Sequence, residues 1–561
     1  MSTQGDPVDA TSWDYIIIGA GSAGCALAYE LLKSDGRATV LLLEAGGSDR
    51  SPFIKVPAGQ IRAVASHDWG YRSQPDPTRN NIAEPWQRGR VLGGSSSING
   101  TMFVRGAARD FDRWAQSLAA GVGSEGASSW SAAAVMPLFR EFEHSDNVSN
   151  WRGNDGPLRV RTVRHPHALT RAFIHSAQAS GYQFNEDYNG ATQEGVCYAQ
   201  LSQGGGLRCS AADAFLKPLA GNRNFKLLLS ACVEKIDFSD GRATGVRFTC
   251  NGTLRTETAR DLIVCAGAIN SPKLLLLSGI GAADELRRHQ IEVVQDLPGV
   301  GLNLKEHPLL RLTYRSRVQT YNLTGGVWQK LGIAARFLRG REGPLANLFE
   351  GAAFLRSSAR AAFPDIQLHF IPLGYSFRDG QLELTSYPSV SVLLNKSYPL
   401  SSGRVRLASR DPGAAPLIEC RLLEDQADID TLVEGIKTIR RIMATQPIAG
   451  FIEEEVEPGS AVNGAEALQA YIRSRTGIAY HPVGTCRMGT GVDAVVDPQL
   501  RVRGIENLWV ADASIMPDLI SGNTNAACMM IGAKLGKYLA RRPLRTASHA
   551  DATPYVRNTL T

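Results

Sequence analysis

The chain has 561 residues, of which 43% are hydrophobic and 20% charged, a composition typical of a globular protein with enough apolar material for more than one core. The formal net charge of +6 is small for this length and is spread along the chain, which argues against a nucleic-acid-binding protein. The nine cysteines form no CxxC pair and match no zinc-ligand spacing, so we expect neither a disulfide framework nor a metal site.

The N-terminal residues give an expectation about location. Residues 1–13 contain neither the basic stretch nor the apolar stretch of a secretory signal. No apolar run in the sequence approaches the ~20 residues that a bilayer-spanning helix requires. We therefore expect a cytoplasmic protein, either soluble or in peripheral contact with a membrane, whose cysteines stay reduced.

The strongest local pattern begins at residue 13. The apolar stretch WDYIII predicts a strand, GAGSAG (residues 19–24) predicts a turn, and the Ala- and Leu-rich stretch after it predicts a helix. This is the context of a dinucleotide-binding turn. There Gly19 permits the tight turn, Gly21 lets the backbone approach a pyrophosphate, and Gly24 lets helix and strand pack closely.

The residues beside this turn extend the prediction. N–H groups at the start of the helix, near Ser22 and Ala23, would face the phosphates. A second apolar strand, ATVLLLEAG, reaches Glu44 at 20 residues after the last glycine of the turn, with Ala45 next to it. Glu44 would accept hydrogen bonds from ribose hydroxyls and disfavours the 2′-phosphate of NADP. Both NAD and FAD fit the pattern.

Two further segments are rich in glycine. In residues 89–106, Gly93 and Gly94 precede three serines, a sequence whose N–H groups and hydroxyls suit a phosphate or the edge of a ring. The stretch DLIVCAGAINSPKLLLLSGIG (residues 261–281) predicts a strand, a glycine turn and a helix that a glycine terminates. The first of these segments could on its own also be a structural loop.

Taken together, these segments resemble the glucose–methanol–choline (GMC) oxidoreductase family. The likeness is carried by GAGSAG, by GRVLGGSSSINGTMFVRGAARDFD (residues 89–112) and by GAINSPKLLLLSGIG (267–281), in that order. LPGVGLNLKEHP (297–308) and ADASIMPDLISGNTNAA (511–527) add to it, with Glu306 where many relatives have Asp. The resemblance implies FAD rather than NAD as the cofactor.

The resemblance also implies how FAD is held. Some relatives attach it through a histidine directly before the asparagine of the first long segment, and here that position is Ile98, so we expect FAD without a covalent bond. The expected cofactor-binding residues are Gly19, Gly21, Ser22, Ala23, Gly24, Glu44, Ala45, Gly94, Asn99, Gly100, Thr101, Met102, Val233, Ala266, Asp512, Ala513 and Asn525.

The implied fold is α/β, with a doubly wound, Rossmann-like FAD domain assembled from discontinuous segments and a substrate domain with a mixed β-sheet flanked by helices. We expect residues 13–310 to form the N-terminal FAD-binding region and 311–464 mainly the substrate domain. Residues 465–540 would return to the FAD domain with the active site, and 541–561 would form a tail. IQLHFIPL and SVSVLLN predict strands of the substrate domain, and DQADIDTLVEGIKTIRRIMATQP predicts an amphipathic helix.

The likeness directs attention to the stretch YHPVGTCRMG. In this family the base is a histidine in such a motif, here His481, and its partner lies a little over forty residues later. Asn525 is 44 residues after His481, so the family register favours Asn525, although Asn523 is nearby. A neutral imidazole can accept the proton of an alcohol while the amide N–H holds the same oxygen. We expect the other histidines to be structural or solvated, including His307, with His369 as a possible cavity residue.

The substrate is less defined than the cofactor. NLFEGAAFLRS (residues 347–357) resembles a segment of choline dehydrogenases, so Glu350 could balance a quaternary ammonium, with Tyr480 as an aromatic neighbour; a structural ion pair is the alternative for Glu350. A neutral primary alcohol is favoured over choline. Oxygen, a quinone or another acceptor would take the electrons. Hydroxynitrile lyase and light-driven fatty acid decarboxylase activities remain alternatives on the same fold.

Overall fold

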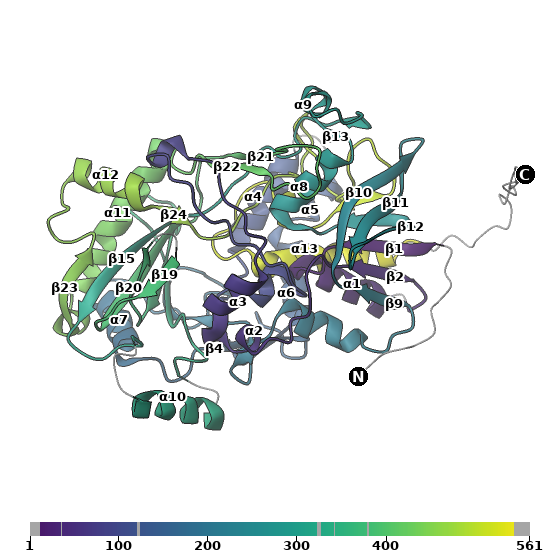
Figure 1. The fold of residues 1–561 in the computed structure, drawn as a ribbon. Helices are drawn as coiled ribbons and strands as arrows, with labels where there is room; N and C mark the ends of the chain where they lie inside the picture. Colours follow the sequence, from purple (N-terminus) through teal and green to yellow (C-terminus); the bar gives the residue numbers. More distant parts are fainter. Residues whose placement is uncertain are drawn as a thin grey trace, which may run out of the picture.

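The structure is a computed structural model that describes residues 12–34, 36–119, 124–322, 327–340, 343–378 and 381–543. Most of the predicted tail therefore lies outside the described residues. Two sheets, each covered by helices, lie side by side (Figure 1). The order of strands in the first sheet is β10-β11-β12-β1-β2-β9, with β25 beside β12.

The centre of the first sheet is parallel. Its pairs are β1 with β2, β1 with β12, β2 with β9 and β12 with β25, whereas β10, β11 and β12 pair antiparallel. These strands are β1 (Trp13–Ile18), β2 (Val40–Leu43), β9 (Phe225–Leu228), β10 (Ala231–Ser239), β11 (Arg242–Cys250), β12 (Thr253–Val264) and β25 (Leu508–Val510). Because β2 and all of β1 except Asp14 are apolar or aromatic, helices can cover both faces.

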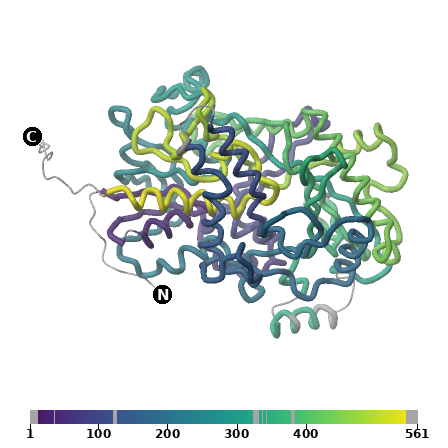
Figure 2. Tube along the Cα trace, turned by 180° about the vertical axis from the view of Figure 1, so that it is seen from behind, coloured from purple at the N-terminus to yellow at the C-terminus, as the bar shows by residue number. Residues whose placement is uncertain are grey.

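Helices α1 (Ser22–Ser34) and α13 (Asn525–Ala540) bring an early and a late segment of the described chain together, as the adjoining purple and yellow segments in Figures 1 and 2 show. Glycines allow their close approach, since a Cβ added at Gly532 would lie 2.1 Å from the carbonyl oxygen of Ala23. The C-terminal helix is therefore part of the first domain.

The second sheet has the order β23-β15-β20-β17-β16-β5, with β24 beside β15. Its strands are β5 (Gly195–Tyr198), β15 (Pro308–Ser316), β16 (Gly351–Leu355), β17 (Ile366–Ile371), β20 (Ser389–Lys396), β23 (Ile452–Glu457) and β24 (Gly477–Ile478). All pairings among these described strands are antiparallel, so the prediction of a mixed sheet was wrong on this point.

Alternation along these strands gives the second sheet two different faces. On β17, Leu368 and Phe370 pack into a core with α7 (Ala168–Ala179), α11 (Gln426–Met443) and α12 (Ala465–Arg475). Between them, His369 lines a cavity on the opposite face. The period of two in strand side chains thus separates a helix-covered core from the wall of the site.

The predicted fold class is confirmed in its main features. The strand predictions at IQLHFIPL and SVSVLLN correspond to β17 and β20, and the predicted amphipathic helix is α11. The domain limits stay a prediction, and the second sheet crosses them: β5 comes from the predicted N-terminal region and β24 from the predicted C-terminal segment.

Further helices surround the two sheets. They are α2 (Pro52–Lys55), α3 (Gln60–His67), α4 (Ala108–Ala119), α5 (Ser124–Ser128), α6 (Ala132–Phe142), α8 (Gly267–Leu277), α9 (Ala283–Arg288) and α10 (Val327–Gly340). The remaining strands, mostly short, are β3 (Glu143–Ser145), β4 (Leu158–Thr162), β6 (Gln200–Leu201), β7 (Gln203–Gly204), β8 (Leu207–Arg208), β13 (Ile280–Gly281), β14 (Gln295–Asp296), β18 (Tyr375–Arg378), β19 (Gln381–Leu384), β21 (Arg404–Arg406) and β22 (Leu417–Glu419). No helix in the described ranges is both long and apolar enough to cross a membrane.

Candidate active site

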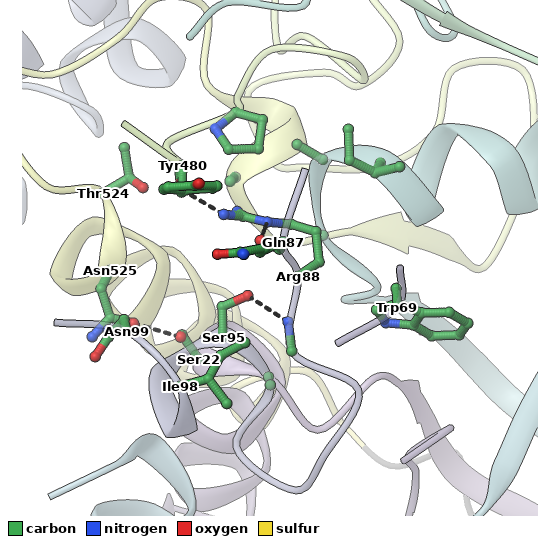
Figure 3. A pocket seen from close by; sticks show the side chains of 18 of the residues that line it. Ser22, Trp69, Gln87, Arg88, Ser95, Ile98, Asn99, Tyr480, Thr524 and Asn525 are labelled. Carbon is green, nitrogen blue, oxygen red and sulfur yellow. Dashed lines mark hydrogen bonds between the residues drawn. The ribbon is translucent and has the colours of Figure 1, made fainter. Parts of the chain in front are cut away.

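A cavity of about 810 Å³ is lined by residues of both sheets. At one end it is lined by residues that follow the parallel strands β1, β2, β12 and β25, and at the other by residues of β15, β17 and β20. Figure 3 shows part of its wall, including Ser22, Ile98, Tyr480 and Asn525. A ligand bound at the carboxyl ends of the parallel strands would extend toward the antiparallel sheet.

The glycine turn after β1 forms a cradle with the second glycine-rich segment. Gly19 has a φ of +105°, and a Cβ added at Gly94 would lie 2.8 Å from the Cα of Gly21. A Cβ added at Gly21 would meet no protein atom within 4 Å, although Gly21 lines the cavity. Backbone at Gly21 is therefore open to a ligand, as the close approach of a pyrophosphate requires.

Two buried carboxylates hold the turns around this cradle. Glu44 accepts hydrogen bonds from the N–H of Ala20 (3.0 Å) and of Gly46 (2.8 Å), and burial raises its pKa to about 7. Asp512 accepts from the N–H of Gly267 (2.8 Å) and the hydroxyl of Ser271 (2.5 Å), and burial raises its pKa too. Both side chains line the cavity while fixing the backbone next to it.

Nearly all the predicted cofactor residues line this one cavity. The exception is Gly24, where an added Cβ would lie 2.0 Å from the carbonyl oxygen of Gly19, so its role is to let helix and turn pack closely. The other predicted residues in the wall are Ser22, Ala23, Ala45, Asn99, Gly100, Thr101, Met102, Val233, Ala266, Ala513 and Asn525.

His481 lies in the wall of the same cavity, between two polar neighbours. Its Nε2 is 3.0 Å from Nδ2 of Asn523, and its Nδ1 is 3.0 Å from Nδ1 of His307. Burial lowers the pKa of His481 well below the ordinary value of 6.5, and the nearby His307, His369 and Arg88 lower it further. The imidazole is therefore neutral at physiological pH and able to accept a proton.

The structure differs from the prediction in the asparagine beside His481. Asn523 makes that contact, whereas Oδ1 of Asn525 accepts a hydrogen bond of 2.6 Å from the hydroxyl of Ser22 (Figure 3). Helix α13 begins at Asn525, so the two side chains leave the backbone in different directions. Counting residues could not separate two asparagines only two positions apart.

Glu350 does not occupy the place suggested for a substrate-binding carboxylate. It is buried, and its side chain accepts hydrogen bonds from the N–H of His167 (2.7 Å) and the hydroxyls of Thr170 (2.6 Å) and Tyr321 (2.5 Å). It is absent from the cavity wall and instead holds the start of α7. The structural alternative, with hydrogen bonds rather than an ion pair, describes it better. Tyr480, the other suggested substrate residue, does line the cavity.

Sequence reasoning missed two residues next to His481. Glu306 accepts hydrogen bonds through one oxygen, Oε1, from the N–H of His307 (2.9 Å) and the N–H of His481 (2.7 Å). His307 is buried rather than solvated and contacts His481 directly. The sequence did contain one indication of Glu306 and His307: both lie in LPGVGLNLKEHP, a segment that contributes to the family likeness. His369, suggested as a cavity residue, lines the wall.

Among the described residues, no group of three or more His, Cys, Asp or Glu side chains is placed to hold a metal ion. The fold and the cavity instead define a class: an enzyme with a dinucleotide cradle that opens toward a histidine. Residues 13–309 and 399–532 match the family models described as GMC oxidoreductase. The chain belongs to the GMC oxidoreductase family.

Relatives match along almost the whole chain. It is 40% identical over 542 residues to an oxygen-dependent choline dehydrogenase of Rhizobium johnstonii, covering 95% of this chain and 96% of that protein. It is 37% identical over 549 residues to an alcohol dehydrogenase [acceptor] of Pseudomonas putida, covering 94% and 96%. The structure of pyridoxine 4-oxidase from Mesorbium loti has a TM-score of 0.86 at 29% identity, covering 95% of this chain and all of that one.

FAD is the cofactor typical of this family, and the cavity fits it. The open backbone at Gly21 would admit the pyrophosphate, and Glu44 lies beside the cradle where an adenosine ribose would bind. On the other side, Asp512 holds the N–H of Gly267 at the start of α8, whose positive end faces the same space. Residues on both sides are thus suited to a long, anionic dinucleotide.

Gly21→Val should weaken FAD binding without unfolding the protein. A Cβ at this position would meet no protein atom within 4 Å, so the new side chain would project into the cavity where the cofactor is expected. An overpacking cost of about 1–3 kcal/mol corresponds to roughly 5- to 150-fold in affinity. FAD titration of the apoprotein measures the change, and Gly36→Val, at another glycine with no protein atom within 4 Å of its added Cβ, is the control. Equal FAD affinity in both variants would contradict the proposed cradle.

Proposed function

We propose that this protein oxidises a neutral primary alcohol to an aldehyde, with FAD as the hydride acceptor and His481 as the base. The observation that carries the proposal is the pairing of His481 Nε2 with Asn523 Nδ2, 3.0 Å apart in the wall of the cavity. Membership of the GMC family and likeness to dehydrogenases named for choline and for alcohols support the reaction class.

The chemistry requires a base at this place. Bound FAD supplies an acceptor for the hydride that leaves the alcohol carbon. Loss of that hydride makes a carbonyl, so the hydroxyl proton must leave as well, and Nε2 of the neutral His481 can take it. A hydroxyl within hydrogen-bonding distance of both Nε2 and the amide of Asn523 would have a proton acceptor and a hydrogen-bond donor beside it.

A residue of the second sheet contacts the side-chain amide of Asn523. Oδ1 of Asn523 accepts a hydrogen bond of 3.3 Å from Nε2 of Gln367 on β17, which leaves Nδ2 facing His481. Nδ2 can donate to the alcohol oxygen as that oxygen gains negative charge. Because this donor is in place before the reaction, little reorganisation is needed at the transition state.

The charges around the cavity favour a neutral substrate over choline. Among the described lining residues, the carboxylates are Glu44 and Asp512, and both already hold backbone N–H groups. The guanidinium of Arg88 lines the same cavity and would repel a quaternary ammonium. Apolar side chains complete the wall near His369, among them Leu309, Leu348, Phe349, Ile371, Leu373 and Leu393.

Two further features of the proposal concern FAD itself. Ile98 lines the cavity at the position where some relatives carry the histidine that attaches the cofactor, and an aliphatic side chain cannot form that bond. The names of the relatives mention oxygen in one case and an unspecified acceptor in the other. We propose non-covalent FAD that passes its electrons to oxygen or to a quinone or another acceptor.

Acid precipitation of the purified yellow protein should leave all of the flavin in the supernatant. Unfolding removes every non-covalent contact, and Ile98 offers no nucleophile for a covalent bond. Absorbance of the supernatant and of the washed pellet measures the partition. Flavin that stays with the pellet would show a covalent link formed by another residue.

His481→Ala should slow anaerobic flavin reduction by an alcohol by about 10²- to 10⁴-fold, the range for loss of a general base. Asn523→Ala should slow it by about 10²- to 10³-fold through loss of the donor to the alcohol oxygen. Asn525→Ala is the matched comparison, since it removes an amide two positions away that contacts Ser22. Asn525→Ala should mainly reduce the amount of FAD that the protein retains. The rate of flavin reduction per bound FAD should change less. Stopped-flow measurements at saturating alcohol would contradict the assignment if Asn525→Ala were the slower variant.

Neutral alcohols such as benzyl alcohol and 1-hexanol should reduce the flavin with kcat/KM at least about tenfold above that of choline, a difference of about 1.4 kcal/mol. The reason is the absence of an uncommitted carboxylate among the described lining residues. Bleaching of the flavin under anaerobic conditions measures the rates, and admission of air then distinguishes an oxidase from a dehydrogenase. Choline as the best substrate would overturn the charge argument. No bleaching by any alcohol would overturn the proposed reaction and favour the lyase or decarboxylase alternative.

A further inference from the structure

His307 makes a contact with His481 that the proposed reaction does not by itself require. We propose that His307 is a positioning residue that fixes the tautomer of His481, so that the lone pair of Nε2 faces the cavity. The inference rests on the proposed role of His481 as the base. It adds the reason why Nε2 carries no hydrogen and can accept a proton.

The first step concerns the far side of the His307 ring. Its Nε2 lies 3.0 Å from the carbonyl oxygen of Ser397 and 3.1 Å from that of Ile520. Carbonyl oxygens only accept hydrogen bonds, so Nε2 of His307 must carry a hydrogen. One N–H is thus shared between two acceptors from separate parts of the chain.

The second step concerns the near side of the same ring. His307 is fully buried, and desolvation lowers its pKa to about 4, so the ring is neutral and carries only one hydrogen. With that hydrogen on Nε2, the Nδ1 of His307 presents a lone pair. Nδ1 of His481, 3.0 Å away, must therefore carry a hydrogen and donate it.

The contact on the cavity side of His481 agrees with this result. Nδ2 of Asn523 can only donate, and Oδ1 of the same amide accepts from Gln367. Nε2 of His481 must therefore accept and carry no hydrogen. The opposite tautomer would place two lone pairs between the histidines and two hydrogens between His481 and Asn523.

Glu306 keeps the two rings in register. Its Oε1 accepts the backbone N–H of both His307 and His481, at 2.9 and 2.7 Å. The rings are nearly perpendicular, at 86°, with centroids 5.2 Å apart, which lets the two Nδ1 atoms meet edge to edge. One carboxyl oxygen of Glu306, whose pKa burial raises to about 8, therefore holds the backbone of both histidines.

Proton transfer is compatible with this arrangement. The hydroxyl proton moves to Nε2 of His481, and the imidazolium so formed keeps its Nδ1–H on the lone pair of His307, which neither gains nor loses a proton. The charged and titratable groups that act on His481 are His307, His369, Arg88 and Glu306, and Asp518 acts on His307. A lone-pair acceptor stabilises the imidazolium without placing a second charge in the cavity.

The direct test is ¹⁵N NMR of the FAD-loaded wild-type protein labelled at histidine, without substrate. We expect His481, assigned by loss of its signals in His481→Gln, to show the tautomer with hydrogen on Nδ1. A tautomer with hydrogen on Nε2, or an equal mixture, would overturn the inference. Because this readout needs no turnover, it stands even if the proposed alcohol oxidation fails, and the His481→Ala kinetics test that reaction separately.

Two variants distinguish tautomer control from packing. His307→Asn can keep an oxygen acceptor near the position of Nδ1, whereas His307→Leu keeps bulk and loses the acceptor. In His307→Leu, flavin reduction should slow by about 10- to 100-fold, as for loss of one hydrogen bond to a charged group. Because the imidazolium of His481 loses its acceptor, the acid limb of the kcat/KM profile should move to lower pH.

His307→Asn should restore most of the rate and the wild-type pH profile, with FAD content and circular dichroism confirming that each variant is folded. Equal losses in both variants, with an unchanged pH profile and an unchanged His481 tautomer, would show that His307 acts through packing alone. If His307→Leu does not fold, the wild-type spectrum and the His307→Asn profile still decide the question.

Discussion

The site depends on one carboxyl oxygen that holds two separate segments of chain. Oε1 of Glu306 accepts the N–H of its own neighbour, His307, and that of His481, which is 175 residues further along. Both histidines therefore lie at the same edge of the second sheet, since His307 precedes β15 and His481 follows β24, its antiparallel neighbour. The position of the His481 backbone is therefore set by a hydrogen bond to Glu306, and the packing of the imidazole ring adds to this.

Burial then determines the chemistry of the pair. An enclosed, mostly apolar cavity disfavours charge, and it lowers the pKa of both His307 and His481. A base kept neutral in this way is available over a wide pH range but binds a proton weakly. A carboxylate in place of His307 would raise the pKa of His481 and put a negative charge against the site where an alkoxide forms. The neutral partner avoids that repulsion.

Local features of this protein were predictable from the sequence because their causes are local. The turn of Gly19–Gly24 and the strand that ends before Glu44 follow from side-chain size and apolar pattern over a few tens of residues. The choice between Asn523 and Asn525 as the partner of His481 does not follow from such local features. It depends on where α13 begins and how its first turn faces the cavity. Likeness in a short segment also suggested that Glu350 binds the substrate. Its side chain instead lies outside the cavity wall and accepts a hydrogen bond at the start of α7.

His307 was beyond sequence reasoning for a related reason. Its partners are the carbonyls of Ser397 and Ile520, 90 and 213 residues away, and the ring of His481 at 174. Neither carbonyl is marked by a residue type, because every residue has a carbonyl. The tautomer of a histidine is a property of the hydrogen bonds on both of its nitrogens, so it becomes readable only when those partners are in place. In this fold the chain of hydrogen bonds begins at the carbonyls beside His307 and ends at the amide N–H of Asn523. Between these two ends, the two neutral rings can place their hydrogens in one way.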